Sequence, residues 1–235
     1  MAKAMLLIGL KDGQAEGDFE KEYLGGRAKE LADSANVTKY VANIVRQPTQ
    51  EMIDAGWGWG GKDESGILGI DEVWYPDDFD VLSLYKGHNV IGAYECNEIP
   101  IRTCVAQWPV GTKSHWVKRM GLLKCFDEQR PEDFHQYWMH IHARKALKNH
   151  LGAGMYFQNH FIKTLKAAPT VWNGSMSLDY WNIDSFQYGH FSQPDSRAII
   201  AEDGSHFMDI FLAIYVEEYV MKRPEGEEFA KAIEP

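Results

Sequence analysis

The chain repeats itself weakly along its whole length, and this repeat limits the folds available to it. Aligning Met5 with Met120 shifts the sequence by 115 positions, and one further residue of shift extends the match. The matching pairs are Met5 with Met120, Phe19 with Phe134, Ala28 with Ala143, Tyr40 with Tyr156 and Asn43 with Asn159. The segment 74–79 also resembles the segment 181–186. A repeat of ~110 residues is the size of a small domain.

Each unit shows the same order of predicted elements. A short apolar run is followed by a loop, an amphipathic helix, two β-rich segments, a second helix and a closing strand. Pro131 suits the first turn of the helix in the second unit. This β-α-β-β-α-β order predicts an α+β protein of two tandem ferredoxin-like repeats, residues 1–112 and 113–235. Two such sheets can bury their apolar faces against each other within one chain, as a dimeric-α+β-barrel-type unit.

Composition excludes several classes of partner. The net charge of -10 argues against a nucleic acid or an anionic membrane surface. The sequence has no apolar stretch of ~18 residues, and its first residues do not resemble a signal peptide. The three cysteines, an odd number without CxxC spacing, indicate free thiols. We therefore expect a cytoplasmic protein, and the sequence leaves open whether it forms a homodimer.

Histidines are concentrated after Met120, where seven of the nine lie. Histidine transfers protons near neutral pH, so convergence of several would suit acid–base chemistry. On a helix, His140 and His142 point ~200° apart, while His135 and His142 share a face but lie ~10 Å apart. The chain also has no HExxH or CxxC motif. A metal centre built from one local motif is therefore not predicted.

The strand predicted around 155–162 has one unusually polar face. Alternation places Tyr156, Gln158 and His160 on one side, and Asn159 on the other. A face with three polar groups does not suit a sealed core unless something pairs with them, so a pocket is the simplest explanation and a water-filled interface the second. Asp179 could orient one of the histidines, although an exposed carboxylate is the simpler interpretation.

The same segments resemble the EthD family of the dimeric α+β barrel superfamily. The resemblance rests on the helix motif from Phe134 to Trp138 with His142 and Ala143, and on the strand motif from Tyr156 to His160. It is good over residues 119–221 and weak over 4–110. In the first unit Arg27 stands in the place of His142, and Ile44 or Val45 in that of His160. The first unit is then expected to be a structural partner.

The resemblance implies an enzyme that acts on a small aromatic or polyketide-like compound without a metal or cofactor. Its reaction would be proton transfer, as in a decarboxylase, a dehydratase or an isomerase. His142 and His160 would be the general acid and base. The residues expected to bind the substrate are His135, Tyr137, Trp138, Tyr156, Gln158, Asn159 and Trp181, with the two tryptophans stacking on the ring.

Several alternatives stay open at this stage. A cofactor-free monooxygenase would use the same aromatic pocket and would consume dioxygen. The superfamily also contains a haem-binding branch, and a non-catalytic ligand carrier or a purely structural barrel are further possibilities. The Gly-Trp-rich loop at 56–61 could be an aromatic lid or a plug against the sheet.

Overall fold

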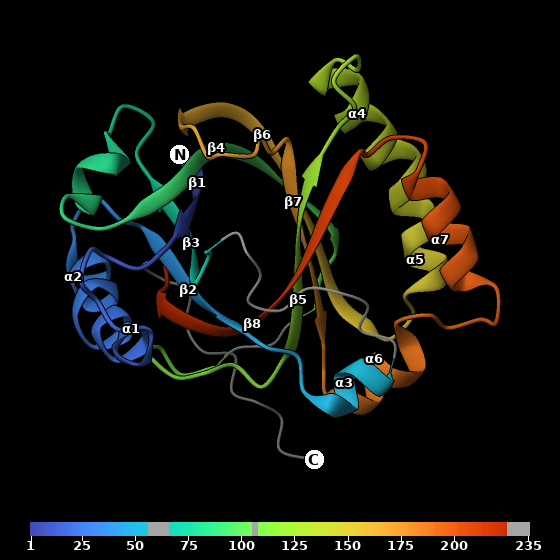
Figure 1. Cartoon of the computed structure of the whole chain (residues 1–235), viewed down its shortest axis with the longest axis horizontal. Helices are drawn as coiled ribbons and strands as arrows, with labels where there is room; N and C mark the ends of the chain where they lie inside the picture. The colour runs from blue at the N-terminus through green and yellow to red at the C-terminus, as the bar shows by residue number, and fades with distance from the viewer. Residues whose placement is uncertain (56–65, 105–107, 225–235) are drawn as a thin grey trace.

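Eight antiparallel strands close into one barrel, which is the centre of the molecule (Figure 1). The computed structural model describes residues 1–55, 66–104 and 108–224, so the predicted lid at 56–61 lies outside the described residues. Around the barrel the strands follow the order β1-β3-β2-β8-β5-β7-β6-β4. The strands are β1 (Ala2–Ile8), β2 (Lys39–Arg46), β3 (Gly69–Tyr75), β4 (Val90–Arg102), β5 (Val117–Lys124), β6 (Ala153–Lys166), β7 (Gly174–Tyr180) and β8 (Ile210–Lys222).

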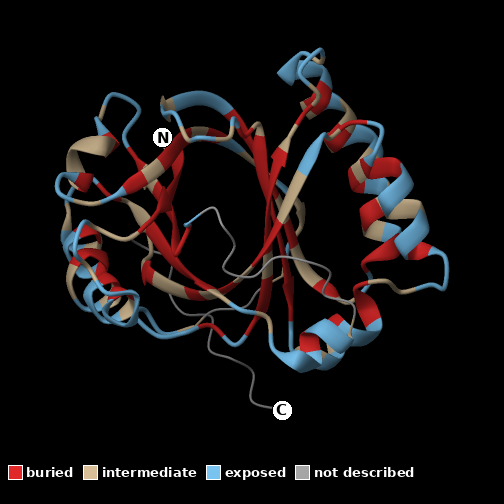
Figure 2. Cartoon of the chain, viewed as in Figure 1, coloured by how far each residue is buried: buried red, intermediate tan, exposed pale blue. Residues whose placement is uncertain are grey.

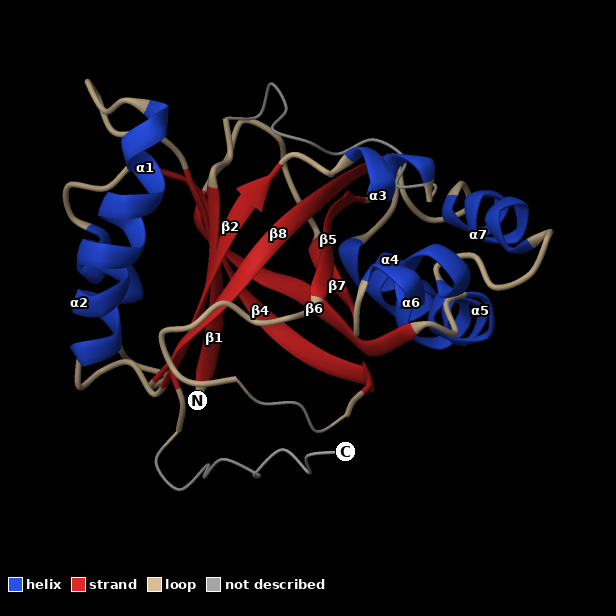
Figure 3. Cartoon of the chain, turned by 90° about the horizontal axis from the view of Figure 1, so that it is seen from below, coloured by secondary structure: helices blue, strands red, loops and turns tan. Residues whose placement is uncertain are grey.

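Helices cover the barrel on two opposite sides (Figures 1 and 3). The first side carries α1 (Glu16–Glu22), the π-helical segment η1 (Tyr23–Arg27) and α2 (Ala28–Asp33). The first half also contains the short 3₁₀ segment η2 (Val81–Tyr85) and the short helix α3 (Gln50–Asp54), which lies on the second side. The second side carries α4 (Pro131–Tyr137), η3 (Trp138–His142, also π-helical), α5 (Ala143–Asn149), α6 (Ile183–Gly189) and α7 (Ser196–Gly204). Buried residues line the strands and the inner sides of these helices (Figure 2).

The two halves of the chain share a strand order and the helical segment between their first two strands. The first half runs β4-β1-β3-β2 around the barrel, and the second runs β8-β5-β7-β6. The halves join where β2 pairs with β8 and where β4 pairs with β6. The barrel therefore closes only with strands from both halves. That the halves are ferredoxin-like repeats with a boundary after residue 112 stays a prediction.

Strand pairing refines the alignment of the two halves. Lys3 pairs with Trp74 across β1 and β3, and Lys118 pairs with Asp179 across β5 and β7. Lys3 matches Lys118 at the offset of 115, so the residues opposite them hold equivalent positions. The equivalent of Trp74 in the second half is therefore Asp179. The expected match of Trp74 with Trp181 is therefore wrong by two residues, since the two Trp-containing segments resemble each other only in composition.

Other sequence predictions agree with the structure. Pro131 begins α4, where its missing N–H costs nothing. The sequence predicts the closing strand of the first half at residues 99–106, and its start is wrong, because β4 already begins at Val90. All three cysteines are free thiols. No helix within the described residues is long and apolar enough to cross a membrane.

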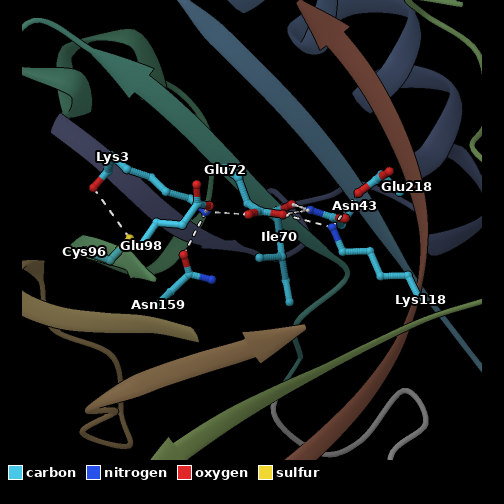
Figure 4. Close-up of polar contacts among 9 residues, drawn as sticks. All are labelled: Lys3, Asn43, Ile70, Glu72, Cys96, Glu98, Lys118, Asn159 and Glu218. Carbon is cyan, nitrogen blue, oxygen red and sulfur yellow. Dashed lines mark hydrogen bonds and ion pairs between the residues drawn. The ribbon is translucent and has the colours of Figure 1, made fainter. Parts of the chain in front are cut away.

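The lumen of the barrel contains a chain of polar side chains rather than a purely apolar core. The ammonium of Lys3 donates to Glu72 and to Asn159, and the ammonium of Lys118 donates to Glu72 and to Glu218 (Figure 4). Glu72 therefore bridges two buried lysines that hold equivalent positions in the two halves. Apolar residues of both halves, including Met5 and Met120, pack elsewhere in the lumen.

Candidate active site between the barrel and the second-half helices

An apolar cavity of about 230 Å³ lies between the outer face of the barrel and the helices of the second half. Its floor is formed by β5, β6 and β7, and its opposite wall by η3, α5 and α7. The charged or titratable groups of the lining are arginine and histidine side chains and the hydroxyl of Tyr156. Most of the remaining lining is apolar, with Trp138, Met176, Leu178, Phe191, Phe207 and Phe211 contributing. A largely apolar cavity with a few polar groups is the usual form of a small-molecule site.

His142 lines this cavity and forms the best-defined polar contact in it. It is the last residue of η3, and its Nδ1 lies 2.6 Å from Oδ2 of Asp203 in α7. Asp203 is fully buried and also accepts hydrogen bonds from Lys145 and from the Tyr137 hydroxyl. Burial would raise the pKa of Asp203, but hydrogen bonds from His142, Lys145 and Tyr137 outweigh it and hold the pKa well below its usual range.

This contact fixes the tautomer of the imidazole. The ionised carboxylate of Asp203 accepts a hydrogen bond from Nδ1–H, so neutral His142 carries its hydrogen on Nδ1 and keeps a lone pair on Nε2. Nε2 can then accept a proton from a bound molecule, while Asp203 stabilises the resulting imidazolium. The pair has the geometry of a general base held by a carboxylate.

Further titratable groups surround the same cavity. Burial lowers the pKa of Arg119 to about 10, and its guanidinium lies 5.1 Å from the centre of the Phe211 ring. Arg119 therefore stays charged at neutral pH. Burial also lowers the pKa of His150 to about 4 and holds that of His190 well below its usual range. These two histidines are neutral walls of the cavity, and His190 is fixed by a 2.6 Å hydrogen bond with the Tyr180 hydroxyl.

The predicted polar face of β6 points toward the helices. The Gln158 amide donates to the Tyr156 hydroxyl at 2.8 Å and to the backbone carbonyl of Trp138 at 3.2 Å. Its Oε1 accepts from Nε2 of His160 at 3.0 Å. The three side chains thus pair with one another, and only Tyr156 reaches the cavity lining. Alternation identified the face, but this mutual pairing satisfies much of its polarity.

His160 does not share the cavity with His142. Its ring stacks on His135 at 4.4 Å and on Trp138 at 5.0 Å between ring centres, and it is 5% exposed. Burial, and then the neighbouring His135, lower the pKa of His160 to about 3. His135 is held by a 2.8 Å hydrogen bond to the carbonyl of Asn173. The structure therefore places His160 behind Trp138 as a packed, neutral group.

The remaining predicted site residues are divided among other environments. Trp138 lines the cavity, whereas Tyr137 lies behind it as a donor to Asp203. Asn159 points into the barrel lumen, where it accepts from Lys3. Trp181 is 48% exposed and packs on Trp116, with ring centres 4.5 Å apart. The structure thus does not bring Trp138 and Trp181 together around one ligand.

Sequence reasoning missed Asp203 and Arg119. Asp203 reaches His142 only because α7 packs against α5, and no spacing in the sequence announces that contact. Arg119 could have been found, since it belongs to the same strand as Lys118 and alternation places the two on opposite faces. Within the described residues, no group of three or more His, Cys, Asp or Glu converges as ligands of a metal ion would.

Comparison with known proteins shows similarity in structure but not in sequence. No protein-family model matches the chain, and no curated protein matches it. Its fold resembles that of an anthrone oxidase-like protein, with a TM-score of 0.54 and 7% identity, over 99% of this chain and 96% of the other.

Two further solved structures show the same similarity. A candidate monooxygenase from Lactobacillus acidophilus has a TM-score of 0.50 and 10% identity, over 94% of this chain and 96% of its own. A variant chlorite dismutase from Candidatus Nitrospira defluvii has a TM-score of 0.50 and 8% identity, over 94% and 92%.

These similarities and the topology define the fold class. The chain has a mixed α and β fold around an antiparallel barrel, and the three solved structures share this fold. In this protein a single chain supplies all eight strands. Membership of the dimeric α+β barrel superfamily, and of the EthD family within it, stays a prediction.

Proposed function

We propose that this protein is an enzyme that binds a small, flat, largely apolar molecule in the helix-side cavity and removes a proton from it with His142. The hydrogen bond between His142 and the buried Asp203 at the cavity wall is the observation that carries the proposal. A carrier would need the cavity but would have no use for an oriented imidazole.

The surroundings of His142 support this role. Asp203 keeps the Nε2 lone pair available, and the charge of Arg119 would stabilise an anion that develops on the substrate. Aromatic walls such as Trp138 and Phe207 match a ring-containing substrate and exclude water from it. An aromatic or polyketide-like compound with an acidic C–H or O–H group fits these features.

Two reaction classes follow from the same first step. In the first class, the imidazolium returns the proton to another atom of the anion, which gives an isomerisation, or to a leaving hydroxide, which gives a dehydration. A decarboxylation also belongs here, because the C–C bond breaks, CO₂ leaves and the proton returns to the carbon. The second candidate is a cofactor-free monooxygenase, in which the electron-rich substrate anion reacts with dioxygen. The names of the similar structures, a candidate monooxygenase and an anthrone oxidase-like protein, favour this second candidate.

Haem requires a separate test of fit, because the superfamily has a haem-binding branch. The helix-side cavity measures about 230 Å³, whereas pockets for drug-sized ligands occupy ~300–1,000 Å³. A haem is larger than such ligands, so we propose that this cavity does not hold one. A Soret band in the purified protein would contradict this conclusion.

Hydrogen–deuterium exchange of a model substrate tests proton abstraction without knowledge of the product. Anthrone in D₂O should exchange its methylene protons faster with the protein than without it, as followed by NMR. His142→Ala should reduce the catalysed rate ~10²–10⁴-fold. Asp203→Asn should also reduce it, since an amide cannot stabilise the imidazolium.

His160→Phe is the matched control, because His160 is also a histidine of the second half but is packed behind Trp138. This variant should retain most of the exchange rate. If His142→Ala were as active as the wild type while folded, the assignment would be wrong. Binding of anthrone without exchange would favour a carrier, and dioxygen consumption during turnover would select the oxygenase.

A further inference from the structure

A second cavity lies inside the barrel, on the other side of the sheet from the proposed active site. Its volume is about 210 Å³, and its lining contains both charged groups and tryptophans. The carboxyl groups are Glu72, Glu98, Asp179 and Glu218, and the tryptophans are Trp74, Trp108 and Trp116. None of these residues belongs to the helix-side cavity, so the lumen has to be considered as a separate site.

The lysines of the lumen are already engaged by three of the carboxylates. Lys3 donates to Glu72, Glu98 and Asn159, which uses all three of its N–H donors. Lys118 donates to Glu72 at 3.1 Å and to Glu218 at 2.5 Å. The set therefore has two buried ammonium groups for four carboxyl groups, and Asp179 is the member without an ion-pair contact in the described part of the chain.

Asp179 faces the cavity, and its hydrogen bonding is incomplete. Its side chain is buried, with a relative exposure of 2%, yet Oδ1 has no hydrogen-bond partner among the described residues. It is therefore not the exposed carboxylate that the sequence suggested. Buried polar atoms without a partner are rare in folded proteins and call for an explanation such as a bound ligand.

Charges around Asp179 determine its protonation. Burial raises its pKa to about 8, Lys118 opposes this, and Glu218 and Glu72 add to it. Lys39 and Arg223 lie at the rim, where Lys39 contacts the Trp74 ring and Arg223 donates to the carbonyl of Trp108. At neutral pH the carboxyl is mostly protonated, and a cation placed beside it would favour its ionised form.

The tryptophans provide a suitable surface for an organic cation. The Trp108 and Trp116 rings meet edge to face, with centres 6.1 Å apart. The Trp74 ring already has two ammonium groups near it, those of Lys3 and Lys39, each 4.4 Å from its centre. Aromatic faces attract cations. The cavity therefore combines the Oδ1 of Asp179, which is unpaired in the described part of the chain, with tryptophan rings that stabilise a positive charge.

We propose that the lumen cavity binds a small organic amine, whose ammonium group donates to Asp179 while its apolar part lies against Trp116. This proposal does not depend on the chemistry of His142, so an experiment can disprove either proposal without affecting the other. Binding transfers the Asp179 proton to solvent, which leaves a carboxylate–ammonium pair in the lumen. The other carboxylates remain paired with Lys3 and Lys118.

Isothermal titration calorimetry with benzylamine tests this proposal on the full chain. Benzyl alcohol has the same shape without the charge and should bind at least tenfold more weakly. In buffers with different heats of ionisation, benzylamine binding near neutral pH should release up to one proton per site. Its affinity should increase as the pH rises toward about 8, where Asp179 ionises.

Two variants make the result specific. Asp179→Asn resembles the protonated acid, so it should fold normally and bind benzylamine about 10–100-fold more weakly, as expected for loss of a hydrogen bond to a charged group. His142→Ala alters the other cavity and should bind benzylamine unchanged. Equal binding of benzyl alcohol, unchanged binding by Asp179→Asn, or no binding of benzylamine would each overturn the proposal.

Discussion

The two halves of the molecule share a strand order and a helical segment after the first strand, but they use the space between sheet and helices differently. In the first half this space is filled by a buried carboxylate, Asp71, which accepts from the hydroxyls of Tyr23, Tyr40 and Tyr85. The guanidinium of Arg27 forms an ion pair with the same carboxylate. In the second half the corresponding space is the cavity lined by His142.

Strand register shows which substitutions produce this difference. Asp71 pairs with Leu6 and Met176 pairs with Gly121, so Met176 holds the position of Asp71. The last residue of the π-helical segment is Arg27 in the first half and His142 in the second. One half thus closes its interior with a charge network, while the other replaces the network with an apolar floor and an imidazole. In a barrel of this kind, one half can contribute stability while the other half binds a ligand.

The largest expected effect comes from giving the first half the floor residue of the second. Asp71→Met leaves the buried guanidinium of Arg27 and three hydroxyls without their shared acceptor. We expect a loss of ~3–5 kcal/mol in the free energy of unfolding, measured with urea. Met176→Leu, at the equivalent position, should lose less than ~1.5 kcal/mol. Similar losses in both variants would remove the contrast between the two halves.

Acid should destabilise the protein through the neutral histidines of the second half. The pKa of His160 is about 3 in the folded chain and ~6.5 in an unfolded one, so the unfolded chain binds the proton first. This contribution to stability is complete above pH ~6.5 and decreases as the pH falls toward 3, by up to ~1.4 kcal/mol per pH unit. His150 acts in the same direction, as does the partly exposed His88 of the first half.

Urea midpoints between pH 7.5 and 5 would measure this dependence. His160→Phe should flatten it, because phenylalanine retains the stacking but cannot take up a proton. The exposed His140 provides the control, and His140→Gln should leave the slope unchanged. An identical slope in wild type and His160→Phe would contradict the proposed buried, neutral state.

Two equivalent glycines provide a finer comparison. A Cβ on Gly174 would lie 2.5 Å from the Trp138 ring and 3.0 Å from the carbonyl of Asn159. A Cβ on Gly69 would lie 3.1 Å from the Tyr23 ring. We expect Gly174→Ala to cost ~1–3 kcal/mol and Gly69→Ala less, by thermal or urea unfolding. Displacement of Trp138 should also weaken anthrone binding, and unaltered binding in Gly174→Ala would argue against Trp138 as a cavity wall.

The sequence was sufficient to predict what depends on local pattern. The offset of 115 correctly matched Met5 with Met120 and Arg27 with His142, because element lengths are nearly the same from β1 to the π-helical segment. Strand alternation also placed Tyr156, Gln158 and His160 on one face. These predictions need only the periods of helices and strands.

Tertiary packing decided what the sequence could not. Alternation gives the face of His160 but does not reveal that Trp138 and His135 cover it. The partner of His142 comes from α7, whose hydrophobic pattern is too weak to predict how it docks. Asp179 was misjudged because a single carboxylate beside a tryptophan gives no indication that eight strands will close around it.

The smallest expected effect on stability concerns the position that best distinguishes the halves. His142→Ala removes one of three donors to Asp203, and Lys145 and Tyr137 remain, so the loss should be ~1 kcal/mol or less. Arg27→Ala removes the only ion-pair partner of Asp71 among the described residues and should cost more. The two variants can be compared directly by urea unfolding.

If His142→Ala were as destabilising as Arg27→Ala, the histidine would be a structural counterpart of the arginine. A small loss of stability combined with a large loss of anthrone exchange would instead show that His142 serves catalysis and not stability.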